Sequence, residues 1–272
     1  MKRRQGIYKI DDEDYFADES INKSYLWKLH NQTPAHAQFA TAKTTSMELG
    51  SAVHFAILEP HAAQKKIVQG PETRRGKKWI ELQKEAHENE KILLTKDDYN
   101  QCMEIRDSVW RNPACSDLLG RKNTMYEHAA FWTFEDLNLK CKVDAVCENT
   151  IIDLKTSVDA SPRGFAQACA KYGYHMQDAI YRSGWSIASG KEITNFIFIV
   201  VEKHQPYATA IYELDAMSKR EGLACFHEAL ETHKECTEQQ FFYGYPLEKI
   251  LLSLPPYAYR HTNPHQIRLV KE

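Results

Sequence analysis

The spacing of hydrophobic and polar positions changes along the chain and divides it into three parts. Helical patterns fill much of the sequence up to about residue 120. From about residue 125 the apolar positions alternate or form short runs rich in β-branched and aromatic residues, which is typical of strands. Helical spacing returns after Pro162 and, following two more strand-like runs, after Asp215. The pattern predicts a helical front, an α/β centre and a helical end.

Start and stop signals give the bounds of these elements. Thr45-Ser46-Met47-Glu48 fits a capping box and opens a helical segment that runs to Pro60. The other expected helices cover about residues 79–91, 96–111, 163–171, 174–189 and a stretch that begins at Asp215. The expected strands cover residues 125–134, 139–148, 151–155, 195–202 and 207–214. This order of elements predicts a single mixed α/β domain.

Composition shows an ordinary globular protein without an excess of positive charge. The chain has 272 residues, of which 43% are hydrophobic, and this suffices for a sizeable core. Lys and Arg number 35 against 37 Asp and Glu, for a net charge of -2, so any nucleic-acid site must be a local patch on a near-neutral body.

The sequence also limits the compartment. The longest apolar run, 196–201, is far shorter than the roughly 20 residues that span a bilayer. No apolar stretch follows the basic start Met1–Arg4, as a secretory signal requires. The seven cysteines include no CxxC pair, which favours scattered buried thiols over a disulfide framework or a structural zinc site. We expect a cytoplasmic protein with no membrane partner.

Two aspartates in the predicted hairpin are candidate metal ligands. If Asn149-Thr150 is a two-residue turn, Asp144 and Asp153 lie diagonally on one face with β-carbons roughly 7–8 Å apart. A divalent cation with carboxylate oxygens about 2.0–2.2 Å away bridges that gap. A turn with an odd number of residues would place them on opposite faces, because a one-residue slip turns every side chain over. The strand period places these residues together on the opposite face: Cys141, Val143, Ala145 and Cys147.

Such carboxylates on a rigid sheet suit phosphodiester hydrolysis. They hold Mg²⁺ with positions left open for water and a phosphate oxygen, and the ion stabilises the charge that builds up on phosphorus. Lys155, two residues beyond Asp153, brings an ammonium group that can orient the nucleophile or offset that charge. Asp and Lys at this spacing are also common on solvated strand faces, so this pair alone leaves both interpretations open.

Four elements in a fixed order resemble the RecB-type branch of the PD-(D/E)XK nuclease superfamily. They are Gly50-x-x-x-His54, Asp144, Asp153-x-Lys155 and Gln177-x-x-x-Tyr181. The opening of the chain is similar to that of the RecE-type (exonuclease VIII) nuclease domain of phage and prophage recombination systems. That similarity includes Tyr15, residues 20–29, Thr33-Pro34-Ala35-His36 and the run from Met47 through His54 to Leu58-Glu59-Pro60. The likeness as a whole covers about residues 7–235.

The resemblance implies an α/β, restriction-endonuclease-like fold. Its core is a mixed central sheet of about five strands flanked by helices, with a helical N-terminal region. We expect a single exonuclease domain over residues 1–245, with a helical front over about 1–120 and a catalytic α/β core over about 121–235. Residues 246–272 form a C-terminal tail in this scheme.

The resemblance further implies a Mg²⁺-dependent, ATP-independent exonuclease, in which Mn²⁺ can replace Mg²⁺ and each site holds two ions. The enzyme degrades linear double-stranded DNA from its 5′ end and leaves 3′ single-stranded tails for a RecT-like single-strand annealing protein. A ring-like homo-oligomer is implied by the resemblance alone. No GxxxxGK[ST] motif occurs, in agreement with ATP independence. Cys225 and Cys236 do not make the tight C-terminal cysteine group of cluster-bearing relatives, so we expect no iron–sulfur cluster.

The same resemblance assigns roles to residues of the hairpin and the capped helix. Asp144 and Asp153 bind metal, His54 completes the coordination, and the Leu154 carbonyl is a further ligand. Lys155 positions or activates the attacking water. The ordinary alternative for His54 is a partly buried histidine on an apolar helix.

Three further residues take supporting roles in this scheme. Gln177 and Tyr181, one helical turn apart on one face, contact DNA or support the site. Glu127, on the preceding strand, is an auxiliary carboxylate. Their ordinary alternatives are packing, surface exposure and a structural role beside aromatic residues.

A basic stretch before the helix near residue 79 is a candidate DNA-binding surface. Its charges, next to an aromatic ring, suit phosphates and a terminal base. The stretch contains Arg74, Arg75, Lys77, Lys78 and Trp79. Arg163, early in a later helix, is a candidate ligand for a 5′-phosphate. The alternative for all of them is a solvated surface.

Two other functions fit the same residues. One is a structure-specific or single-strand nuclease on the same site, which would also cut circular DNA. The other is a non-catalytic DNA-binding subunit. The presence of Asp144, Asp153, Lys155 and His54 together argues against a dead site.

Overall fold

The centre of the protein is a six-stranded sheet, seen here in a computed structural model that describes residues 4–41, 44–255 and 258. Its strand order is β1-β4-β5-β6-β7-β8, and every pair is antiparallel except the parallel pair β6 and β7. The strands are β1 (Gly6–Tyr8), β4 (Met125–Phe134), β5 (Leu137–Cys147), β6 (Thr150–Ser157), β7 (Asn195–Glu202) and β8 (Thr209–Tyr212).

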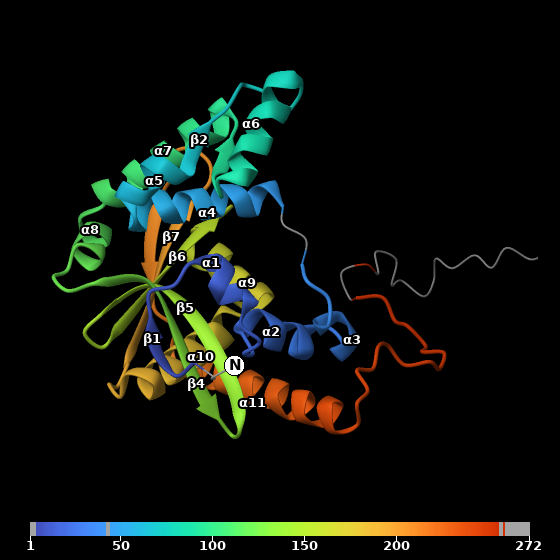
Figure 1. The fold of residues 1–272 in the computed structure, drawn as a ribbon. Coiled ribbons are helices and arrows are strands. Elements are labelled where there is room, and N and C mark those ends of the chain that lie inside the picture. The colour runs from blue at the N-terminus through green and yellow to red at the C-terminus, as the bar shows by residue number, and fades with distance from the viewer. Residues whose placement is uncertain (1–3, 42–43, 256–257, 259–272) are drawn as a thin grey trace, which may run out of the picture.

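Helices cover both faces of the sheet (Figure 1). One face packs against α2 (Lys23–Asn31), α9 (Pro162–Tyr172), α10 (Tyr174–Ser189) and α11 (Ala216–Glu238). The other packs against α4 (Thr45–Leu58), α5 (Pro60–Lys66), α7 (Lys96–Arg111) and α8 (Pro113–Leu119). The remaining elements are α1 (Asp12–Ala17), α3 (Pro34–Ala37), α6 (Lys77–Glu88) and a separate parallel pair, β2 (Ile67–Gln69) and β3 (Ile92–Leu94).

Capping side chains set the starts of the long helices. Thr95, Ser161 and Asp215 each accept a hydrogen bond from the backbone N–H three residues on, as N-caps do. The helix α4 begins one residue earlier than the capping-box interpretation requires. Thr44, rather than Thr45, is its N-cap and accepts from the Met47 N–H at 3.3 Å.

From residue 125 on, the elements follow the predicted order along the chain, and the central sheet has six strands where about five were expected. The additional strand, β1, is three residues long and therefore too short to show an alternating pattern. It is a strand because Gly6 pairs with Phe131 and Tyr8 with Ala129 on β4. The last predicted strand, 207–214, is shorter in the structure, where β8 ends at Tyr212.

The hairpin turn has an even number of residues, as the metal-site hypothesis requires, but it lies one residue earlier than predicted. Cys147 pairs with Thr150, so the turn is Glu148-Asn149. Glu148 takes a left-handed conformation there, with φ of 54°. Ala145 consequently lies opposite Ile152, two positions away from the register that a turn at Asn149-Thr150 would give.

The strand period is interrupted at Asp144. Val143 belongs to the core under α10, whereas Ala145 belongs to the core under α4, so the predicted common face of these residues was wrong. Directly across the ladder, Glu127 has φ of 54°, a left-handed conformation that costs a non-glycine residue about 1 kcal/mol or more. The acidic side chains of Glu127 and Asp144 lie at this irregular position of the β4–β5 ladder.

Further sequence-based expectations concern the tail, the membrane and the cysteines. The predicted tail, 246–272, lies only partly within the described residues. Among the helices in the described parts of the chain, none is both long and apolar enough to cross a membrane. All seven cysteines are buried.

Candidate active site

The site begins where β5 and β6 separate. Their paired stretch ends at Ala145 and Ile152, and Asp144 and Asp153 are the next residues along the two strands. Asp144 Oδ2 accepts a hydrogen bond from the Leu154 N–H at 2.7 Å. The Asp144 side chain thus takes the place of a backbone acceptor, which fixes it in the gap between the strands.

Helix α4 brings His54 to this gap. Its Nδ1 lies 3.4 Å from Asp144 Oδ1. His54, Glu127 and Asp144 each offer one ligand atom, and these atoms lie within 4.8 Å of one another. A shared ion fits such a group, because oxygen and imidazole ligands of Mg²⁺ or Mn²⁺ stand about 2.0–2.2 Å from the metal.

The three side chains perturb one another. Burial would lower the pKa of His54, but the Asp144 charge and hydrogen bond outweigh it and raise this pKa to about 9. Burial would raise the pKa of Asp144, yet the charge of His54 lowers it. Burial, followed by the charge of Asp144, raises the pKa of Glu127 to about 7. Such opposed shifts are common at functional sites.

Asp153 is almost fully buried, 3% exposed, on the face of β6 that meets α10. Its Oδ1 accepts a hydrogen bond from Gln177 Nε2 at 2.5 Å. The Lys155 ammonium lies 2.5 Å from Oδ2 and pairs with it. The carboxylate and imidazole ligand atoms of the neighbouring His54, Glu127 and Asp144 suit a divalent metal.

Lys155 is held from two sides. Its ammonium pairs with Asp153 and lies 4.7 Å from the centre of the Tyr174 ring. Burial would lower the pKa of Lys155, but the charges of Asp153 and of its other neighbours raise it. The ammonium group therefore keeps its charge beside the gap.

Gln177 and Tyr181 occupy the same face of α10. Gln177 is buried and orients Asp153. Tyr181 is partly buried, packs against the core and lies edge-on to Phe196 at 6.2 Å. Gln177 directly supports a candidate ligand, whereas a role of Tyr181 at the site stays a prediction.

The basic stretch divides into two parts. Arg74 forms ion pairs with Glu48 at 2.9 Å and Asp98 at 3.0 Å, and its guanidinium lies over the Trp79 ring. Trp79 is buried, 5% exposed, so its ring does not face solvent for stacking with a base. These contacts give both residues a structural role.

The other basic candidates are exposed: Arg75, Lys77, Lys78 and Arg163. The first three flank the start of α6, and Arg163 lies in the first turn of α9. Their contact with DNA stays a prediction, as does the Leu154 carbonyl as a ligand.

Sequence reasoning missed the residues that support the site from outside the motifs. Lys142 Nζ lies 3.3 Å from Glu127 Oε2 and 2.6 Å from Asp12 Oδ1. The strand period could have shown Lys142, two positions before Asp144. Tyr174 follows no motif and reaches Lys155 only through the fold.

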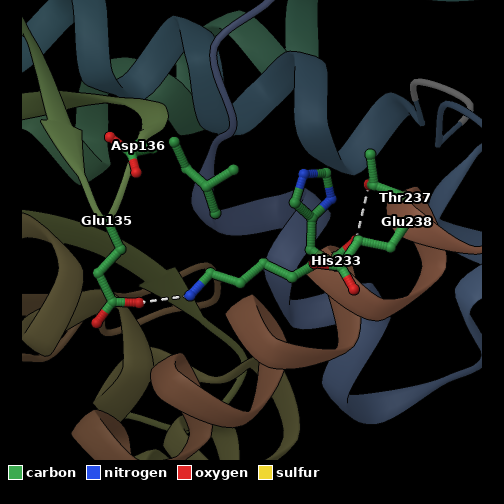
Figure 2. Close-up of a pocket in the computed structure, with 7 residues that line it drawn as sticks. Glu135, Asp136, His233, Thr237 and Glu238 are labelled. Carbon is green, nitrogen blue, oxygen red and sulfur yellow. Dashed lines mark hydrogen bonds and ion pairs between the residues drawn. The ribbon is translucent and has the colours of Figure 1, made fainter.

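A pocket of about 620 Å³ lies away from these residues, at the turn between β4 and β5 and the end of α11. Figure 2 shows Glu135 and Asp136 facing the α11 side chains, with the ion pair of Glu135 and Lys234 at 2.7 Å. None of its lining residues belongs to the acidic cluster, so we do not place the active site there.

The mixed sheet with helices on both faces, and the acidic pair, lysine and glutamine at its splayed strands, define a PD-(D/E)XK-type protein. Residues 26–245 match the family described as "PDDEXK-like domain of unknown function (DUF3799)". The chain belongs to this family, and the predicted fold class is confirmed. Proteins of this superfamily generally use divalent metals, in agreement with the cluster around Asp144.

Similar structures support the fold. A crystal structure described as "Putative exonuclease" from Eubacterium rectale is 14% identical, with 89% of this chain and 97% of that chain covered and a TM-score of 0.58. At this identity the likeness shows the fold alone. The crystal structure of SSO0001 is 16% identical over 71% of this chain and 87% of that chain, with a TM-score of 0.29, too low to support a conclusion. The search of curated proteins found no match.

Proposed function

We propose that the protein is a divalent-metal-dependent deoxyribonuclease that hydrolyses phosphodiester bonds. The observation that carries the proposal is the convergence of His54, Glu127 and Asp144 next to the buried pair Asp153 and Lys155. Carboxylates and an imidazole on one side, with an ammonium beside them, are the groups that metal-assisted phosphoryl chemistry needs.

Each residue has a defined task in this proposal. Asp144, Asp153 and His54 hold the metal, which, when bound, polarises the phosphate and makes water a better nucleophile. Gln177 fixes the Asp153 carboxylate by its hydrogen bond. The Lys155 ammonium stabilises negative charge on the phosphate oxygens and helps to position water, because it is charged and held at the edge of the site.

The finer proposal is an ATP-independent 5′-to-3′ exonuclease on linear double-stranded DNA. Its support is the opening of the chain, which is similar to that of RecE-type nucleases, and the exonuclease description of the similar Eubacterium rectale structure. In this proposal Mg²⁺ or Mn²⁺ serves the site, with two ions in place, and the 3′-tailed product passes to a single-strand annealing protein.

Degradation of end-labelled DNA tests both levels of the proposal. Linear duplexes labelled at the 5′ or the 3′ end, and a closed circular duplex, are incubated with Mg²⁺ and without ATP. We expect early release of the 5′ label and an intact circle. The Asp153→Asn variant, which keeps the size of the side chain, should lose at least about 100-fold in rate, because a metal ligand supplies several kcal/mol of charge stabilisation.

The other outcomes separate the alternatives. Cleavage of the circle would support the active-site assignment but would identify the enzyme as a structure-specific nuclease rather than an exonuclease. Binding without any metal-dependent cleavage supports a non-catalytic subunit. Full activity in Asp153→Asn would contradict the site assignment.

A further inference from the structure

A second lysine lies close to the candidate active site. Lys23, at the start of α2, has its Nζ 5.7 Å from the centre of the Tyr174 ring, the ring that Lys155 approaches to 4.7 Å. Since both ammonium groups lie against one ring, they are at most about 10 Å apart. Lys23 belongs to none of the four motif elements of the nuclease superfamily and reaches the site only through the fold.

The position of Lys23 is fixed by its surroundings. Its Nζ donates a hydrogen bond to the Tyr172 carbonyl and lies 5.6 Å from the centre of the Trp27 ring. Trp27 packs so closely on Gly173 that a β-carbon there would come within 2.4 Å of the indole. Gly173 also has φ of 66°, which favours glycine. The joint between α9 and α10 is thereby shaped to receive α2 and its lysine.

The charge of Lys23 is not matched by an acid. Lys155 pairs with Asp153, whereas among the described residues no carboxylate lies within ion-pair distance of Lys23. Burial, followed by the charge of Lys155, lowers the pKa of Lys23 to about 7. An anion next to the two ammonium groups would relieve this repulsion.

Exposed aromatic surface adjoins the two lysines. Tyr172 is 48% exposed, and its ring lies 5.8 Å from that of Tyr174. Lys171 adds a third ammonium, 5.2 Å from the Tyr172 ring. Cations beside exposed aromatic rings are typical of surfaces that hold a nucleic-acid strand by its phosphates and bases.

We infer that the corner formed by Lys23, Tyr172 and Tyr174 is a phosphate-binding subsite that holds the nucleic-acid strand beside the metal centre. The inference rests on the proposed nuclease function and adds a substrate contact to it. Because Lys23 and Lys155 are at most about 10 Å apart, their ammonium groups can serve neighbouring phosphates of one strand. Lys23 acts as a positioning residue: it binds a neighbouring phosphate, and Lys155 serves the reacting one.

Salt-dependent DNA binding tests the subsite. The full-length protein is titrated with a labelled duplex carrying a single-stranded end, in EDTA, at several salt concentrations. Lys23→Gln should weaken binding several-fold and reduce the slope of log K against log salt by about 0.7–0.9, the loss of one phosphate contact. Lys23→Arg should restore the affinity and the slope. In cleavage with Mg²⁺, Lys23→Gln should raise KM more than it lowers kcat.

Lys28→Gln is the matched control. Lys28 lies on the same helix, and its Nζ also donates to a backbone carbonyl, that of Phe39. Its substitution should leave the affinity and the slope unchanged. Melting temperatures show whether each variant keeps the fold. Lys23→Arg keeps the positive charge, so it shows whether lost binding comes from the lost phosphate contact or from the lost hydrogen bond to the Tyr172 carbonyl.

The outcomes distinguish the inference from the proposed function. If Lys23→Gln binds as the wild type does, or if Lys28→Gln loses as much, the subsite is wrong, although cleavage by the wild type still supports the nuclease. If the wild type binds DNA through Lys23 but never cleaves, the nuclease proposal fails and the subsite stands. A wild type that neither binds nor cleaves DNA overturns both.

Discussion

The candidate metal ligands of this protein are held in place by neighbouring groups of the fold. Asp144 is fixed by a backbone N–H of β6 and by His54, and Asp153 by Gln177 and Lys155. The Leu154 N–H, Gln177 and Lys155 thus position the carboxylates, and His54 must release its proton before its nitrogen can bind a metal. Such support from neighbouring side chains is what keeps a metal site in a productive geometry.

The His54 and Asp144 pair predicts how the stability of the metal-free protein depends on pH. The pKa of His54 rises from its unfolded value of about 6.5 to about 9 in the fold. The stabilisation from protonated His54 is therefore complete below about pH 6.5 and is lost as the pH rises through about 9. The lowered pKa of Asp144 adds a second limit, because its share is lost when acid protonates this carboxylate.

Thermal unfolding in EDTA measures this effect. Wild type and His54→Gln are compared from pH 5 to pH 10, and the gap between their melting temperatures should be widest near pH 6 and close above pH 9. A gap that stays constant across this range would show that His54 does not pair with Asp144 in the folded protein.

Lys155 predicts a separation of rate from metal affinity. Lys155→Gln removes the charge that we assign to the phosphate and the water, but it leaves Asp144 and His54 in place. Cleavage should slow by about 100-fold or more, while Mn²⁺ binding, followed by calorimetry, should change by much less. Equal losses of rate and Mn²⁺ affinity would show that Lys155 only supports the metal ligands and does not act on the phosphate or the water.

At the scale of elements, close helix packing holds α10, and with it Gln177, against β6. Gly222 of α11 lies so near α10 that a β-carbon would meet the His175 carbonyl oxygen at 2.0 Å. Since that obstacle is backbone, the two helices must move apart to admit a methyl group. Gly222→Ala should lower the free energy of unfolding by about 1–3 kcal/mol.

A second helical glycine provides the control for this prediction. At Gly50 of α4 a β-carbon would meet only Thr156 Oγ1, at 3.9 Å, an ordinary contact. Gly50→Ala should stabilise the protein by up to about 1 kcal/mol, through helix propensity. Denaturant unfolding gives the free energy of unfolding of both variants. If the two substitutions change it by the same amount in the same direction, packing between α10 and α11 is not the cause of the effect at Gly222.

At the scale of the whole molecule, the assembly stays a prediction. The ring-like homo-oligomer follows from the resemblance alone. Its expected sign is a solution mass, by light scattering, that is a fixed multiple of the 31.5 kDa chain across concentrations. A monomer at every concentration would contradict it.

Individual residues show which features of the fold and the site can be predicted from the sequence. The order of the motifs gave the fold class, and the strand spacing placed Asp144 and Asp153 in one hairpin, because period and turn length are local properties. The four strands 125–134, 139–148, 151–155 and 195–202 lie close to their observed bounds for the same reason. The short strand β1 was not predicted, since only its pairing with β4 makes it a strand.

What the sequence determined by itself is the set of chemical groups: two aspartates, a lysine, a histidine, a glutamate and a glutamine, in an order that implies metal chemistry on phosphates. What only the tertiary structure decided is their geometry. The left-handed turn at Glu127, the change of face at Asp144, the burial of Trp79 and the approach of Lys23 to Tyr174 all depend on contacts between distant segments. Local patterns carry no information on such contacts, because these depend on how whole elements pack.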